Sequence, residues 1–126
     1  MNVAFARNEY ANAKSNALSS KSENFEAVSL ALRHLLDSMS ALKDAESPEE
    51  REPLFEKSLT SIYFLQKCLD FETGGELAKN LFRVYEFSRQ SVLDFVLREK
   101  GPDNIDKSIE YVNLIFDGWN GIEDSV

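Results

Sequence analysis

The sequence predicts an all-α protein, an antiparallel four-helix bundle with a flexible or short-helical N-terminal cap segment. The five Gly and three Pro residues fall almost entirely at boundaries, and both interrupt helices, so they divide the chain into an N-terminal arm and four long segments. In those segments apolar residues recur at spacings of three and four, as on one face of a helix. No segment alternates with the period of two that is typical of a strand. Four amphipathic helices with short connections bury their apolar stripes most simply as an antiparallel bundle.

The N-terminal arm is expected to cover residues 1–21, ahead of a bundle that spans residues 22–122. It is rich in Asn, Ala and Ser and carries two aromatic residues, Phe5 and Tyr10. This composition favours either a weakly ordered segment or a short helix docked on the bundle.

The first helix is predicted at about residues 22–43 and the second at about residues 48–71. The stripe of the first helix consists of Phe25, Val28, Leu32, Leu35, Met39 and Leu42. The second helix opens at Ser47-Pro48-Glu49-Glu50, a capping box with Pro at the first helical position. Pro53 then predicts either a kink or a later start, because the residue before a proline is disfavoured in the helical conformation.

The third helix is predicted at about residues 76–100, after Gly74-Gly75, which is interpreted as the turn between two helices. Its stripe consists of Leu77, Leu81, Val84, Ser88, Val92 and Phe95. Gly101-Pro102 ends this helix, and Asp103 is placed to cap the fourth helix at about residues 104–120. The fourth stripe consists of Ile105, Ile109, Val112, Phe116 and Trp119.

The composition indicates one acidic domain. The chain has 126 residues, a formal net charge of −8 and 14 aromatic residues, which suits a packed domain rather than a disordered acidic chain. Negative charge repels phosphate backbones and anionic lipid surfaces, so nucleic acid is not expected as a partner. The first thirty residues lack a signal-peptide pattern, and no run approaches about 18 apolar residues. We therefore expect no membrane insertion and a cytoplasmic location.

Residue types that carry catalysis or bind metals are scarce. The chain has one His, one Cys and no motif of hydrolase, nucleotide-binding or zinc-protease type, so no enzyme activity, cofactor or metal is expected. Cys68 is interpreted as a small, inert core residue. The acidic cluster of Glu49, Glu50 and Glu52 suits a helix N-terminus. His34 leaves a histidine phosphotransfer domain as an alternative, although the Lys and Gly that such domains place a few residues later are missing here.

Large apolar residues off the core faces are more informative. The helical wheel places six of them outside or at the edges of the stripes: Leu30, Phe64, Phe82, Phe87, Leu93 and Leu114. Together they exceed what one four-helix core needs, and rows such as Phe82, Tyr85 and Leu93 predict grooves for a partner's amphipathic helix. Alternatively, the arm or a second copy of the chain covers them, so we expect a monomer or a weak homodimer.

One stretch of the sequence is recognisable. It consists of Leu65-x-x-x-Leu69-Asp70-x-x-x-Gly74-Gly75-Glu76-Leu77-Ala78-x-x-Leu81-x-x-x-Tyr85. This combination resembles the central signature of the FliS family, the cytosolic chaperones of flagellin, and the likeness extends from about Phe55 to Trp119. Further upstream, Tyr10 and the Asn/Ser-rich residues after it are similar to the family's N-terminal segment.

The resemblance implies both a fold and a function. It implies a helical bundle with an N-terminal cap, in agreement with the helix pattern. It also implies binding of the disordered C-terminal region of newly made flagellin, which would otherwise polymerise prematurely, and delivery of this client to the flagellar type III export apparatus. Components of that apparatus are further expected partners. A non-flagellar helical adaptor stays open as an alternative function.

The binding surface expected from these observations is an apolar groove rather than a catalytic site. We expect Tyr10 and its neighbours to cap this groove until the client takes it over. The residues expected to contribute to client binding are Tyr10, Phe64, Leu77, Leu81, Phe82 and Tyr85.

Overall fold

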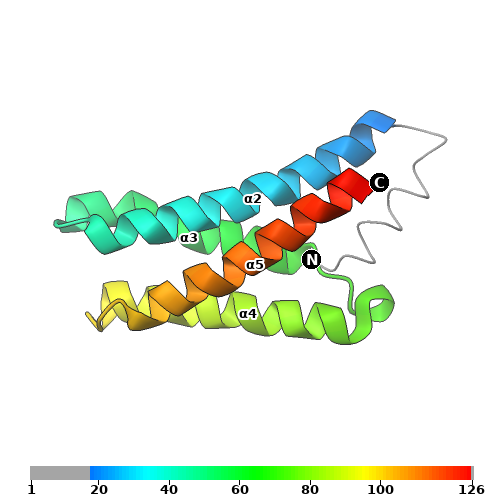
Figure 1. Cartoon of the computed structure of the whole chain (residues 1–126). Coiled ribbons are helices and arrows are strands. Elements are labelled where there is room, and N and C mark those ends of the chain that lie inside the picture. The colour runs from blue at the N-terminus through cyan, green and yellow to red at the C-terminus, as the bar shows by residue number, and fades with distance from the viewer. Residues whose placement is uncertain (1–17, 126) are drawn as a thin grey trace.

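The computed structural model describes the backbone of residues 18–125 and the side chains of residues 25–121. Over that range the chain forms four helices and no strand: α2 (Leu18–Asp44), α3 (Pro48–Lys67), α4 (Phe71–Leu97) and α5 (Asp103–Ser125). Consecutive helices run in opposite directions, and α5 packs against both α4 and α2, which closes the ring (Figure 1). The predicted all-α bundle is therefore confirmed. Most of the predicted arm lies outside the described residues.

Helix α3 begins where its sequence predicts a cap. Ser47 has an extended backbone, and its hydroxyl oxygen accepts a hydrogen bond from the Glu50 N–H at 3.2 Å. Pro48 is the first helical residue, where its missing N–H costs nothing. Pro53 lies inside the helix, so α3 starts at Pro48 and not near Pro53.

The connection between α3 and α4 differs from the prediction. The sequence pattern extends the second helix to about residue 71 and places the turn at Gly74-Gly75, but α3 ends at Lys67 and α4 begins at Phe71. Residues 68–70 form the turn instead. Gly75 lies inside α4 with φ 50° and ψ −125°, where the helix is kinked. The backbone at Gly75 is not helical, so the glycine pair does join two helical segments, a short first turn from Phe71 and the long regular part that starts near the predicted residue 76.

Helix α4 also ends earlier than predicted. Its last residue is Leu97, three positions before the expected end at residue 100. Glu99 adopts a left-handed conformation with φ 52°, and the Lys100 N–H donates back to the Asp94 carbonyl at 3.1 Å. This hydrogen bond satisfies a carbonyl of the last turn, so the chain leaves the helix before Gly101 is reached.

The remaining ends shift by one to five residues. Asp103 is the first residue of α5 rather than its cap, and the Asp106 N–H donates to the Pro102 carbonyl at 2.9 Å. Helix α2 begins at Leu18 instead of near residue 22, and α5 continues to Ser125 instead of ending near residue 120. Helices α2 and α5 are therefore longer than predicted.

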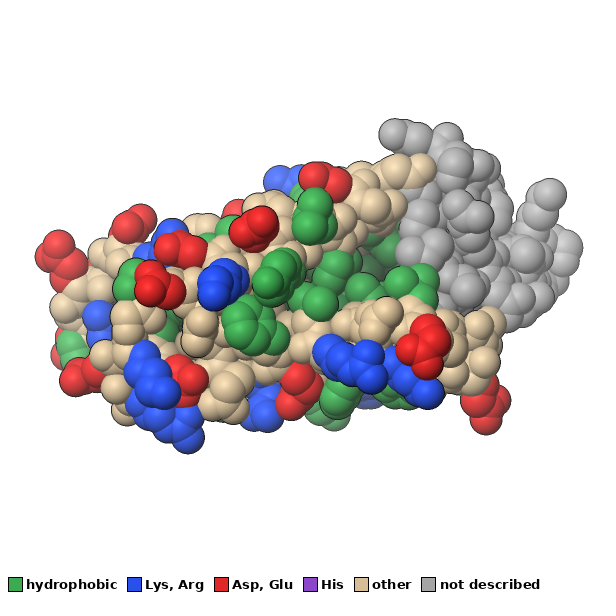
Figure 2. All heavy atoms as spheres, turned by 60° about the horizontal axis from the view of Figure 1, so that its bottom comes forward, with side chains coloured by type: hydrophobic (Ala, Val, Ile, Leu, Met, Phe, Trp, Pro, Cys, Tyr) green, Lys and Arg blue, Asp and Glu red, His purple; other side chains and the backbone are tan. Residues whose placement is uncertain are grey.

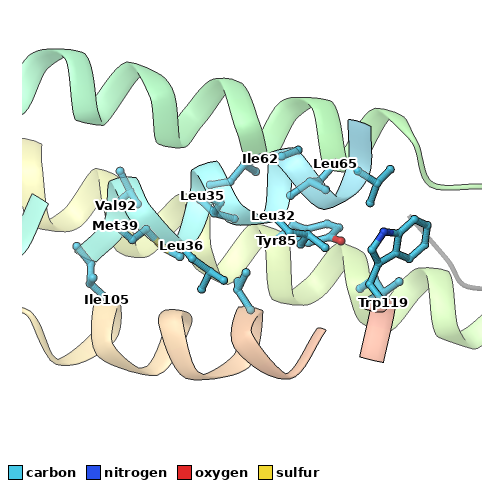
Figure 3. Packing of buried hydrophobic residues seen from close by; sticks show 14 of the residues in the cluster. Leu32, Leu35, Leu36, Met39, Ile62, Leu65, Tyr85, Val92, Ile105 and Trp119 are labelled. Carbon is cyan, nitrogen blue, oxygen red and sulfur yellow. The ribbon is translucent and has the colours of Figure 1, made fainter. Parts of the chain in front are cut away.

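The core runs along the bundle axis between the four helices (Figure 3). Its largest fully buried apolar side chains are Leu32, Leu35, Met39, Leu42, Ile62, Leu65, Tyr85, Val92, Ile105 and Val112. Burial of each such side chain stabilises the fold by roughly 1.5–3 kcal/mol. Every helix contributes to this set, as expected for a bundle that buries one stripe from each helix.

Buried serines join neighbouring helices in the middle of the core. The hydroxyl oxygens of Ser38 on α2 and Ser58 on α3 are 2.7 Å apart, and Ser88 on α4 shares a hydrogen bond with Ser108 on α5. The Ser108 hydroxyl also donates to the Met39 sulfur at 3.3 Å. A buried hydroxyl without a partner is costly. These pairs therefore favour one register of α2 against α3 and of α4 against α5.

Side-chain contacts hold α5 against α2 at both ends of their interface. At one end, Lys43 forms an ion pair with Asp106. At the other end, the rings of Phe25 and Trp119 stack with centroids 4.4 Å apart, and Trp119 Nε1 donates to the Phe25 carbonyl at 3.3 Å. Trp119 therefore fixes the C-terminal part of α5 against the start of α2.

Candidate functional site

The recognisable stretch of sequence forms the corner between α3 and α4. The Asp70 carboxylate accepts hydrogen bonds from the backbone N–H groups of Thr73 and Glu72, both at 3.1 Å, and from the Thr73 hydroxyl at 2.9 Å. These bonds, the Thr73 N–H first among them, lower the pKa of Asp70. The carboxylate therefore acts as the N-cap of α4.

Gly75 sets the direction of the rest of α4. Its combination of φ 50° and ψ −125° is one that residues with a Cβ rarely adopt, so glycine is required here. From the residue after Gly75 the helix runs with regular geometry to Leu97. The Asp and Gly residues of the motif therefore have a structural role, because they determine which α4 side chains face the neighbouring helices.

The structure divides the predicted binding residues into buried and exposed ones. Tyr85 and Leu81 belong to the core, with exposed fractions of 1% and 8%, and Phe64 is partly buried against it. Leu77 and Phe82 are exposed by 40% and 39%. Tyr10 lies outside the described residues. Of the predicted set, Leu77 and Phe82 therefore offer the most surface to a partner.

Burial has chemical consequences for the phenol and the thiol near the corner. Burial raises the pKa of Tyr85 far above its usual range, with a smaller contribution from Cys68, so this phenol stays neutral. Burial also raises the pKa of the partly buried Cys68 thiol, against a smaller opposing effect of Lys67. Neither group has the lowered pKa that would activate a nucleophile. The interpretation of Cys68 as an inert residue at the core is consistent with this.

Leu77 and Phe82 point to different sides of α4. They are five residues apart, which corresponds to about 140° around the helix axis. Phe82 packs edge-on against Phe71, with ring centroids 6.0 Å apart, at the corner with α3. Further along the α3–α4 contact, Gln66 donates to Glu86 at 2.6 Å. The exposed apolar surface of α4 is therefore split between two sides of the helix.

The side of α4 toward α5 carries a second group of apolar residues. Phe87 on α4 and Tyr111 on α5 contact each other, with ring centroids 5.8 Å apart. Tyr111 and Leu114 of α5 are exposed by 42% and 66%. Figure 2 shows apolar side chains gathered in a hollow where α4 and α5 run beside each other. This arrangement can bind an apolar or amphipathic partner.

Sequence reasoning found only part of this surface. It identified Leu30, Phe82 and Leu114 as off-core residues, and all three are exposed. It missed four further exposed residues: Tyr63, Phe71, Leu97 and Tyr111. The signal for Tyr111 was its position three residues before Leu114, which places both on one side of α5.

The polar groups on these helices are mostly paired with each other. Arg89 donates to both carboxylate oxygens of Glu86, at 2.9 Å and 3.1 Å, and Gln66 binds the same carboxylate. These hydrogen bonds, with Arg89 first, lower the pKa of Glu86. His34, the alternative phosphotransfer residue, is a partly exposed residue of α2. Most of these polar contacts lie within α4, and the Gln66–Glu86 hydrogen bond joins α4 to α3.

Two kinds of site are missing from the part of the chain that is described. No group of three or more His, Cys, Asp or Glu side chains there could hold a metal ion. In the same part of the chain, every helix is too short or too polar to cross a membrane. The exposed apolar surface is thus the strongest candidate for a functional site.

Comparison with family models matches residues 6–126 to the family described as Flagellar protein FliS. The chain belongs to the FliS family. The Flagellar secretion chaperone FliS of Vibrio cholerae serotype O1 is 30% identical over 92 residues, which are 73% of this chain. They are 66% of that relative, so the match spans slightly less than two thirds of its length. No solved structure matches the chain.

The FliS family match covers the whole candidate site. It includes the corner at Asp70, the exposed residues of α4 and the exposed residues Tyr111 and Leu114 of α5, and it reaches back to Tyr10. The resemblance that was based on the motif around Gly74-Gly75 is therefore confirmed, and the match extends it over the first helix and most of the arm.

Proposed function

We propose that this FliS-family chain is a cytosolic export chaperone that binds the C-terminal region of flagellin, prevents its premature polymerisation and assists its delivery to the flagellar type III export apparatus. The observation that carries the proposal is the family match over residues 6–126. It is supported by the relative named as a flagellar secretion chaperone. We further propose that the chain acts as a monomer or weak homodimer.

The physical basis is an exposed apolar surface on a stable helical bundle. A disordered client can cover its own apolar faces on such a surface instead of on other flagellin molecules. Ordering a long client segment costs free energy, so we expect an extended interface made of many weak contacts. The net charge of −8 keeps a protein with such a surface soluble.

The residues proposed for client binding have different roles. Leu77 and Phe82 contact the client directly, because they are the exposed members of the set. Leu81, Tyr85 and the partly buried Phe64 form the underlying support that holds these contacts in place. Tyr10 caps the groove until the client displaces it.

The direct test is calorimetry of the full chain with the C-terminal segment of flagellin from the same organism. We expect saturable binding at micromolar concentration, with a negative heat-capacity change from apolar burial. An N-terminal flagellin segment of equal length serves as the control. Lack of binding of the C-terminal segment at micromolar concentration would refute the flagellin assignment.

A pair of variants tests the surface. Phe82→Asp should weaken client binding about tenfold or more, since it places a charge in an apolar contact. Leu97→Asp is the matched control, because Leu97 is an exposed apolar residue at the other end of the same helix. Both variants should keep the helical circular dichroism of the parent. Equal affinities of the two variants would remove Phe82 from the binding surface.

The proposed cap is tested by Tyr10→Ala. If Tyr10 competes with the client for the groove, its removal should strengthen client binding by about threefold, as expected when a competing contact worth under 1 kcal/mol is lost. Weaker binding would instead make Tyr10 a contact of the client.

A further inference from the structure

We propose that the outer face of α5 is a second docking surface, which binds a basic amphipathic helix of a partner protein. The inference goes beyond the proposed function, because it does not involve Leu77 or Phe82 and does not require flagellin as the client. It rests on the exposed apolar residues of α5 and on the charge of that helix. We call Tyr111, Leu114 and Gly118 the α5 stripe.

The α5 stripe has the geometry of a helix-docking surface. Tyr111, Leu114 and Gly118 follow each other at spacings of three and four, so they lie along one side of α5. Leu114 is the most exposed large apolar side chain that the structure describes, together with Tyr63 and Leu97. At Gly118 an added Cβ would meet nothing within 4 Å, so a partner helix can approach closely there.

The charge of α5 indicates that its partner is basic. The helix contains six acidic residues and one lysine, a net charge of −5, so the other 103 residues of the chain share a net charge of −3. Glu110 and Asp117 lie four residues before and three residues after Leu114, so both are its neighbours on one side of the helix surface. Neither has an ion-pair partner among the described residues.

The basic groups near the stripe are few. Lys107 lies one turn before Tyr111, and on α4 Arg83 lies one turn before Phe87 and donates to Asn80 at 2.8 Å. Figure 2 shows acidic and apolar side chains side by side on this face, with a few basic ones among them and along its lower edge. A partner whose apolar stripe is flanked by Lys or Arg would match α5 in both respects.

A second copy of the chain fits this face poorly. Pairing α5 with the α5 of another molecule would bring together two helices that each carry a net charge of −5. Like charges at an interface oppose association. The apolar stripe therefore favours a partner of opposite charge over self-association.

The test uses the full chain and a synthetic peptide of about 18 residues, with Leu on one helical face and Lys on the other. Its binding is measured by calorimetry at low and high salt. We expect saturable binding that weakens as salt increases, because exposed charges are screened. The control peptide has Glu in place of Lys, and equal binding of both peptides would overturn the charge argument.

Two exposed leucines provide matched variants. Leu114→Gln should weaken binding of the Leu/Lys peptide about tenfold, whereas Leu97→Gln should leave it unchanged. The two side chains are exposed by 66% and 65%, so both substitutions should leave the fold intact. Equal effects of the two variants would overturn the proposal, because the peptide would then be attracted to the acidic protein as a whole.

The acidic flank and the other possible occupants are tested separately. The double variant Glu110→Gln, Asp117→Asn should weaken binding of the Leu/Lys peptide about tenfold at low salt and much less at high salt.

Sedimentation of the parent chain tests self-association. A dimer that is lost in Leu114→Gln would overturn the proposal, because the stripe would then bind a second copy of the chain. Competition between the peptide and the flagellin C-terminal segment would likewise overturn it and assign α5 to the client.

Discussion

The two sides of α5 differ in how completely they are covered. On the side toward α2, contacts close both ends of the interface, and between them the guanidinium of Arg33 lies 5.3 Å from the centre of the Phe116 ring. On the side toward α4, a buried serine pair joins the helices near the start of α5, but Tyr111 beside Phe87 remains exposed, as does Leu114 on the outer face. The same helix is thus fixed by one neighbour and leaves apolar surface beside the other.

This difference teaches where a partner can bind without disturbing the fold. Side chains on the α2 side are already used for stability, so a partner there would have to replace existing contacts. Apolar side chains on the α4 side are in contact with water, so covering them is favourable by roughly 25 cal/mol per Å² of surface. The open side therefore offers a partner apolar surface that the fold does not use.

The largest effect on stability is expected on the side of α5 that packs against α2. Trp119→Ala removes the stacked ring and the hydrogen bond to the Phe25 carbonyl, and it leaves a cavity. We expect a loss of about 3 kcal/mol or more in the free energy of unfolding. Urea denaturation followed by circular dichroism at 222 nm measures this loss.

The matched control for Trp119→Ala lies on the open side. Tyr111→Ala removes an aromatic ring that contacts Phe87 but is already 42% exposed. We expect it to change the free energy of unfolding by less than about 1 kcal/mol. If both substitutions destabilised the protein equally, the distinction between a closed and an open side of α5 would be wrong.

Substitution of either of two glycines should change the stability by an intermediate amount. Gly75→Ala should destabilise the protein by about 1–3 kcal/mol, because a Cβ is strained at φ 50° and ψ −125°. Gly118→Ala should stabilise it by about 0.5–1 kcal/mol, because Gly118 is helical and a methyl group there meets open space. Thermal unfolding of both variants measures whether each substitution raises or lowers the stability. A destabilised Gly118→Ala would show that the space beside Gly118 on the α5 stripe is occupied.

The smallest effect on stability is expected at the corner between α3 and α4. The hydrogen bonds to Asp70 lower its pKa in the folded state, so this group contributes stability above its unfolded pKa of about 3.9. The contribution is lost as the pH falls through the lower, folded pKa. Melting temperatures between pH 2 and 7 should therefore decrease below about pH 4, and Asp70→Asn should reduce this decrease. An identical pH profile for Asp70→Asn would contradict the capping role.

The helices were predictable from sequence because each carries an apolar stripe that a bundle buries. The corner was predicted only in part: the break at the glycine pair was expected, but the early end of α3 at Lys67 and the short helical turn that begins at Phe71 were not. The local signal was Asp70, whose carboxylate can cap a helix that begins at Phe71. The prediction followed the glycines and overlooked the cap.

The candidate site was predicted less completely, for a different reason. A helical wheel gives the side of a helix but not how deeply its neighbours cover that side. Tyr85 and Leu81 are therefore core residues, although both were predicted to contribute to client binding. Leu114 was identified because it lies opposite its stripe, whereas Tyr111 lies at the edge of the stripe, and its exposure depends on how α4 and α5 are spaced.

The two serine pairs have a consequence for the order of folding. Ser38 with Ser58, and Ser88 with Ser108, each join residues 20 positions apart, so each pair lies within one helical hairpin. Contacts between residues close in sequence form early, because little loop entropy is lost. Each hairpin can therefore find its alignment alone, the first while the second is still being synthesised, and the native bundle then arises by docking of two halves that are already aligned.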